Sequence, residues 1–130
     1  MDEILKPIGF VRCKEEKVPR HWTVSELTGT LAIDEKYTVG LRDIEEGQKI
    51  VVLFHFHKSV EFTEECLIQT PPAHGGEKRG VFSTCSPRRP NPIGFSVVSV
   101  LSVTGSQILV KGLDMIDGTP ILDIKPYVEA

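Results

Sequence analysis

The chain has 130 residues, of which 40% are hydrophobic and 25% are charged, and its formal net charge is −3. This balance is typical of a globular protein, and we expect a single domain over residues 1–130. No apolar run is long enough to span a bilayer, and acids follow Met1 where a signal peptide has bases, so we expect a cytoplasmic protein without membrane contact. The acidic balance argues against RNA binding over a broad surface, so any RNA contact must be local or be assembled by a dimer.

The first half of the chain predicts three strands. They cover residues 5–11, 26–33 and 49–57, where β-branched and aromatic residues or alternating apolar residues dominate. The charged, proline-containing stretch 13–22 is expected to be a loop, and residues 37–44 a short helix or turn. These features favour a β-rich fold.

The second half predicts short strands separated by turns. Pro71, Pro72 and the pair Gly75-Gly76 disfavour regular structure between residues 58 and 78, and the prolines of residues 86–92 do the same. We expect strands over residues 80–84, 94–103, 107–113 and 121–124. Many short strands with regularly spaced turns indicate an all-β domain, either a barrel or a sandwich with little helix.

Cysteines and histidines give little sign of a metal site. Cys13, Cys66 and Cys85 lie far apart and form no Cys-x-x-Cys pair, so we expect reduced thiols. His55 and His57 would face the same way on a strand. No nearby cluster of cysteines or carboxylates completes a ligand set, and we therefore expect no metal.

One loop is unlike scaffold. It reads Gly80-Val-Phe-Ser-Thr-Cys-Ser-Pro-Arg-Arg-Pro-Asn-Pro-Ile-Gly94, and we call it the signature loop. Three prolines stiffen a segment that carries Arg88, Arg89 and Asn91, so little entropy is lost when it binds phosphate or carboxylate. A rigid surface turn with solvated arginines explains the same residues equally well. A nucleophilic Cys85 is less favoured, because no histidine is placed by sequence to serve it.

A second segment, residues 112–127, gathers acids. Asp114, Asp117 and Asp123 lie close together, with Lys125 beside them, and such carboxylates can accept hydrogen bonds from a ribose or an amino group. Turn capping by Asp117 before Gly118 is the alternative, and composition alone favours it. No Gly-x-Gly-x-x-Gly pattern is present, so a nucleotide cofactor would need a pocket other than a Rossmann one.

The two segments resemble the signature loop and the closing motif of the TrmO/TsaA-like family of S-adenosylmethionine-dependent tRNA methyltransferases. Pro7-Ile-Gly-Phe-Val11, Val18-Pro19-Arg20 and Leu53-Phe-His-Phe-His57 also match in kind and order, so the resemblance covers nearly the whole chain. It implies a small β-barrel that works as a homodimer and binds S-adenosylmethionine without a Rossmann domain. It further implies methylation of the N6 of threonylcarbamoyl-adenosine next to the tRNA anticodon.

The resemblance also implies functional residues, although it assigns no catalytic one. The expected cofactor-binding residues are Cys85, Arg89, Asn91, Phe95, Leu113, Asp114, Met115, Ile116, Asp117, His57 and Lys58. The expected substrate-binding residues are Arg20, His21, Arg88 and Lys125.

Two departures from the family pattern leave alternatives open. Cys85 stands where the family usually has an arginine, so a cation with five donors is replaced by a thiol. The C-terminal extension of larger relatives is expected to be absent. The alternatives are an S-adenosylmethionine-binding module with reduced or lost catalysis, and a methyltransferase with a different acceptor.

Overall fold

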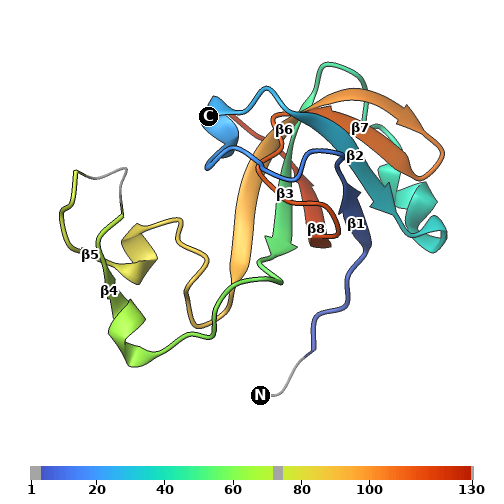
Figure 1. Cartoon of the computed structure of the whole chain (residues 1–130). Coiled ribbons are helices and arrows are strands. Elements are labelled where there is room, and N and C mark those ends of the chain that lie inside the picture. Colours follow the sequence, from blue (N-terminus) through green and yellow to red (C-terminus); the bar gives the residue numbers. More distant parts are fainter. Residues whose placement is uncertain (1–3, 72–74, 130) are drawn as a thin grey trace.

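The fold is a closed barrel of six antiparallel strands, with a small two-stranded sheet beside it (Figure 1). The computed structural model describes residues 4–71 and 75–129. In barrel order the strands are β1 (Gly9–Arg12), β2 (Thr28–Ile33), β7 (Gln107–Lys111), β6 (Ile93–Thr104), β3 (Lys49–His55) and β8 (Pro120–Pro126). The prediction of an all-β barrel is therefore confirmed.

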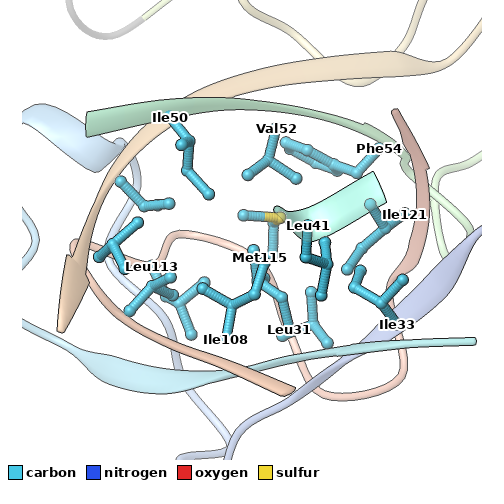
Figure 2. Packing of buried hydrophobic residues seen from close by; sticks show 14 residues of the cluster. Leu31, Ile33, Leu41, Ile50, Val52, Phe54, Ile108, Leu113, Met115 and Ile121 are labelled. Atoms are coloured by element: carbon cyan, nitrogen blue, oxygen red, sulfur yellow. The ribbon is translucent and has the colours of Figure 1, made fainter. Parts of the chain in front are cut away.

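The core fills the barrel because alternate side chains of each strand point inward. On β6, the buried Ser96, Val98 and Val100 face the interior, while Phe95 lies on the outer face. Figure 2 shows that side chains from the connections also enter this interior. The labelled core residues are Leu31, Ile33, Leu41, Ile50, Val52, Phe54, Ile108, Leu113, Met115 and Ile121.

Most predicted strands are confirmed, with ends shifted by a few residues. The strand predicted over residues 80–84 is wrong. Arg79–Gly80 form β5, which pairs only with β4 (Ile68–Gln69), and Val81–Ser83 turn into the 3-10 helix η5. The partner strand β4 has only two residues, so β5 has nothing to pair with beyond Gly80. The chain turns there instead, and the turn buries Val81 almost completely.

An arm, which we define as residues 56–92, leaves the barrel between β3 and β6 (Figure 1). Several of the residues expected to be functional lie where this arm joins the barrel. These two strands pair along their length, ending with His55 opposite Ile93. The first arm residue is tied to the last one, because the N–H of Phe56 donates to the carbonyl of Pro92 at 2.8 Å. Both ends of the arm are therefore fixed side by side on the barrel.

Gly94 shows why the signature loop ends in glycine. A Cβ atom at this position would overlap the ring of Phe54, which is buried in the core. The Phe54 ring in turn packs edge to face against Phe56, with 5.0 Å between ring centroids. The missing side chain thus lets an aromatic pair sit where the arm joins the barrel.

Candidate functional site

Two pockets meet where the arm joins the barrel. The inner pocket, about 200 Å³, is lined by Phe54, His55, Phe56, His57, Lys58, Ser59, Pro87, Asp114, Met115, Ile116 and Thr119. The outer pocket, about 590 Å³, is lined by Arg20, His21, Thr23, Val24, Gln69, Thr70, Pro71, Cys85, Ser86 and Pro87. Pro87 contributes to both pockets, and we call the pair the candidate site.

Five chain segments build this site, and one of them is the arm stretch Gln69, Thr70 and Pro71. The end of β3 and the first arm residues supply one wall, and the signature loop supplies another. The connection between β7 and β8 supplies Asp114, Met115, Ile116 and Thr119, while the loop before the 3-10 helix η1 (Trp22–Val24) supplies Arg20 and His21. Segments far apart in sequence therefore converge on one place.

Asp114 is the carboxylate at this junction. It lines the inner pocket, and its Oδ1 accepts a hydrogen bond from the Ser96 hydroxyl at 2.5 Å. Burial raises the pKa of the Asp114 carboxyl, and the Ser96 hydrogen bond and the nearby His21 oppose that rise in part. A half-buried carboxylate of this kind is suited to a cationic or amino group.

His57 also lines the inner pocket. Burial and the adjacent charge of Lys58 lower the pKa of the His57 imidazole, so the ring is neutral near pH 7. The expectation that His55 and His57 share a strand face is not met, because β3 ends at His55 and the chain turns there. A neutral imidazole can accept a hydrogen bond as well as donate one.

Arg89 shapes the signature loop from within. Its Nη1 donates to the carbonyl oxygens of Thr84 at 3.1 Å and Ser86 at 3.0 Å, and the side chain is half-buried. These bonds fold the loop around the guanidinium, as a capping side chain does at a helix end. Arg89 lines neither pocket, so its shown contacts are with the loop itself.

Two residues outside the motif hold the same loop from the arm. Gln69 Nε2 donates to the carbonyl oxygens of Arg88 and Cys66, both at 2.7 Å. Ser59 Oγ donates to the carbonyl oxygen of Pro87 at 3.1 Å. Neither residue was predicted from sequence, because a lone Gln or Ser in an irregular stretch carries no pattern that points to a distant carbonyl.

The structure brings together about half of the residues expected from sequence. Those that line the candidate site are Cys85, Asp114, Met115, Ile116, His57, Lys58, Arg20 and His21. Those that line neither pocket are Arg89, Asn91, Phe95, Leu113, Asp117, Arg88 and Lys125.

The residues outside the pockets have identifiable places. Asp117 accepts a hydrogen bond from the backbone N–H of Cys13 at 3.0 Å, and it lines a separate pocket next to that residue. Leu113 is fully buried in the core. Phe95 lies on the outer face of the barrel, 54% exposed, and the Lys125 amine pairs with a neighbouring carboxylate at 3.2 Å. These side chains therefore lie outside the two pockets of the candidate site.

Within the described residues, no three His, Cys, Asp or Glu side chains gather closely enough to hold a metal ion. Among the same residues, no helix is long and apolar enough to cross a membrane.

The chain is similar to one known protein family, to several of its named relatives and to solved structures. The tRNA-methyltransferase O N-terminal domain matches residues 11–130. A probable S-adenosyl-L-methionine-binding protein of Pyrococcus abyssi is 42% identical over 127 residues, which are 95% of this chain and 67% of that protein. A tRNA (adenine(37)-N6)-methyltransferase of Mus musculus is 47% identical over 88 residues, which are 68% of this chain and 20% of that protein.

A solved structure agrees with these matches. The crystal structure of TrmO from Pseudomonas aeruginosa superimposes with a TM-score of 0.76 at 33% identity, over 98% of this chain and 57% of that one. The chain thus spans little more than half of the solved protein and a smaller part of the mammalian one. Barrel, motifs and matched range agree, and the chain belongs to the family of the tRNA-methyltransferase O N-terminal domain.

Proposed function

We propose that this chain binds S-adenosylmethionine in the candidate site and transfers its methyl group to the N6 of threonylcarbamoyl-adenosine next to the tRNA anticodon. The observation that carries the proposal is the place of Asp114, a half-desolvated carboxylate in a largely apolar pocket beside the signature loop. Relatives named as S-adenosyl-L-methionine-binding proteins and as tRNA (adenine(37)-N6)-methyltransferases support it.

The residues of the site fit this cofactor. The outer pocket alone falls in the size range of small-molecule sites. Phe54, Phe56 and Met115 line the inner pocket with apolar surface of the kind that contacts a purine, and the Asp114 carboxylate suits an amino group or a nearby positive charge. The bound cofactor would supply an activated methyl group on a sulfonium.

The side chains of this site would mainly position the reactants. Transfer of a methyl group from a sulfonium needs the attacking atom in line at short range, so orientation contributes more than a strong base. Asp114 would hold the donor molecule through its carboxylate oxygens. Neutral His57 would accept a hydrogen bond from the acceptor's N–H and take up that proton late in the reaction, as the methyl group moves to the nitrogen and the sulfonium becomes a neutral thioether.

We also propose that the protein works as a homodimer in the cytoplasm, as one unit over residues 1–130. Support comes from the outer face of the β3–β6 pair at its end next to the arm, where Leu53 stands opposite Phe95 and His55 opposite Ile93. Phe95 is 54% exposed and Ile93 is 40% exposed, so this face presents apolar surface. A second copy on this face would cover that apolar surface and the base of the arm.

Cofactor titration tests the proposal most directly. We expect S-adenosylmethionine to bind wild-type protein in isothermal titration calorimetry, and Asp114→Asn to weaken binding by about tenfold, the loss of one charge-assisted hydrogen bond. Radiolabelled methyl transfer to tRNA that carries threonylcarbamoyl-adenosine then tests the acceptor. Absence of any binding heat from the wild-type protein would rule the proposal out.

One observation favours a second function, a cofactor-binding module without turnover. Exposed Cys85 lines the outer pocket at the position where the family pattern has arginine, and Arg88 lines neither pocket. Such a module would bind S-adenosylmethionine and leave tRNA unmethylated. Methyl transfer to another RNA or to a small molecule, but not to that tRNA, would instead indicate a different acceptor.

A further inference from the structure

A groove outside the candidate site carries cations and aromatic rings. Its first part, about 320 Å³, is lined by Trp22, Thr23, Ser25, Glu26, Lys49, Val97, Ser99, Lys111, Gly112 and Tyr127. Its second part, about 600 Å³, is lined by Gly40, Arg42, Asp43, Ile44, Gln48, Lys49, Ile50, Pro126 and Tyr127. Lys49 and Tyr127 belong to both parts, so the groove is continuous across them.

The strand register produces a line of polar side chains along this groove. Lys49 on β3 stands opposite Ser99 on β6, and Ser99 stands opposite Lys111 on β7. Neighbouring strands lie about 4.8 Å apart, so the two lysine backbones are roughly 10 Å apart on the outer face. Their flexible amines can therefore reach neighbouring phosphates of one strand of nucleic acid.

Two aromatic rings border this line. Trp22 lies on η1, and Tyr127 follows β8, with its backbone N–H donating to the carbonyl of Lys49 at 3.3 Å. The Lys49 amine lies 5.9 Å from the centroid of the Tyr127 ring, and that residue is 39% exposed. Trp22 and Tyr127 line the same part of the groove, so η1 and the residue that follows β8 lie close together.

The local charge differs from that of the whole chain. The groove residues include Arg42, Lys49 and Lys111 against Glu26 and Asp43, although the complete chain has a net charge of −3. Glu26 is paired with Lys111 at 2.7 Å and is 82% exposed at its side chain. Cations beside aromatic rings, here the exposed Tyr127 and the half-buried Trp22, are a pattern that binds single-stranded nucleic acid through phosphate contacts and base stacking.

We propose that this groove holds a single-stranded segment of the acceptor RNA, with phosphates on Lys49 and Lys111 and a base stacked on Tyr127. This inference rests on the proposed function, because it supplies the RNA contact that a methyltransferase of net negative charge needs. The groove also adjoins the candidate site: η1 places Trp22 in the groove, and the preceding His21 lines the outer pocket. An RNA held in the groove would lie next to the place of methyl transfer.

Fluorescence anisotropy of a labelled tRNA anticodon stem–loop, across a series of salt concentrations, tests this groove. We expect Tyr127→Ala to weaken binding by about fivefold or more with an unchanged salt slope, as for a lost stacked base. Lys49→Ala should lower the magnitude of the salt slope by about 0.7, the value for one phosphate contact to a single strand. Glu26→Gln should tighten binding, because it releases the Lys111 amine.

Lys14→Ala is the matched control, since it removes one exposed cation that lines a different pocket and should leave the slope unchanged. Tighter binding by Glu26→Gln is a result that loss of folding would not produce. Wild-type affinities in Tyr127→Ala, Lys49→Ala and Glu26→Gln would overturn the inference. A change in their sedimentation in place of RNA affinity would also overturn it, because a second copy would then occupy the groove.

The cofactor titration distinguishes a failure of the RNA groove from a failure of the proposed function. All groove variants should bind S-adenosylmethionine as wild-type protein does, since Tyr127, Lys49 and Glu26 line neither pocket of the candidate site. Methylation of the stem–loop by wild-type protein, together with unaffected RNA binding by the variants, would refute the groove and leave the proposed function standing. No RNA binding by wild-type protein would refute both the tRNA acceptor and the groove.

Discussion

Replacing Ser96 with alanine removes the partner that compensates the burial of Asp114. Ser96 is fully buried on an inward position of β6, and its hydroxyl donates to the Asp114 carboxylate at 2.5 Å. A hydrogen bond to a charged group contributes about 1.5–3 kcal/mol. For 130 residues the unfolding entropy is about 0.27 kcal/mol per degree, so Ser96→Ala should lower Tm by about 5–11 °C.

The pH dependence of this effect follows from the raised pKa of Asp114. The folded protein holds the Asp114 proton more tightly than the unfolded chain, so this group favours folding most below its unfolded pKa of about 3.9. That contribution is lost as the pH rises through the folded pKa. The Ser96 hydroxyl stabilises the ionised form of Asp114, so the unfolding free energy lost in Ser96→Ala should increase as the pH rises through the folded pKa. In an Asp114→Asn background this pH dependence should disappear.

Urea unfolding of wild type, both single variants and the double variant, at pH 7 and near pH 3.5, measures this coupling. Ser102→Ala is the control, because it removes an exposed hydroxyl from the same strand. The reasoning fails if Ser96→Ala costs no more than Ser102→Ala at pH 7. It also fails if the double-mutant cycle gives no coupling energy between Ser96 and Asp114.

Three further predictions concern the signature loop. Gly94→Ala should cost about 1–3 kcal/mol in urea unfolding, because its Cβ displaces the packed ring of Phe54; an unchanged midpoint would contradict that contact. Gln69→Leu removes the donor to the carbonyl of Arg88 and should weaken S-adenosylmethionine binding in calorimetry. Gln69→Glu should weaken it as well, since an ionised carboxylate cannot donate a hydrogen bond, and wild-type affinity in either variant would argue against this role. Cys85→Arg should tighten cofactor or tRNA binding by about tenfold with unchanged Tm, because the side chain is exposed on a roomy pocket; equal affinity for both ligands would show that no cation is needed there.

The barrel was predictable because one face of each strand is buried, so apolar residues tend to recur at every second position along it. The alternation of Phe95 and Val97 with Ser96 and Val98 predicted a strand, and the structure has one with the second set inward, although Val97 is also covered. Strand ends were less accurate, because pairing and not propensity decides where a strand stops, as at Gly80.

The candidate site was only partly predictable. Motif resemblance pointed to Asp114 and Cys85, which line adjoining pockets, and also to Asp117, which the turn directs toward Cys13. Ser96 carried a usable signal, since a polar residue on the inward face of a core strand needs a partner. Gln69 carried none, because its role depends on how the arm folds back in three dimensions.

The way the arm is fastened has a consequence for its stability. Among its described residues only Val81 is buried, whereas the barrel holds a continuous core. The arm can therefore open locally at a lower free energy than the barrel, while its two ends stay clamped on paired strands. A ligand bound against Pro87 and Asp114 would bridge both parts, so amide hydrogen exchange in the arm would report on occupancy. The barrel would thus keep its structure while the arm, fixed to it at both ends, reports whether a ligand is bound.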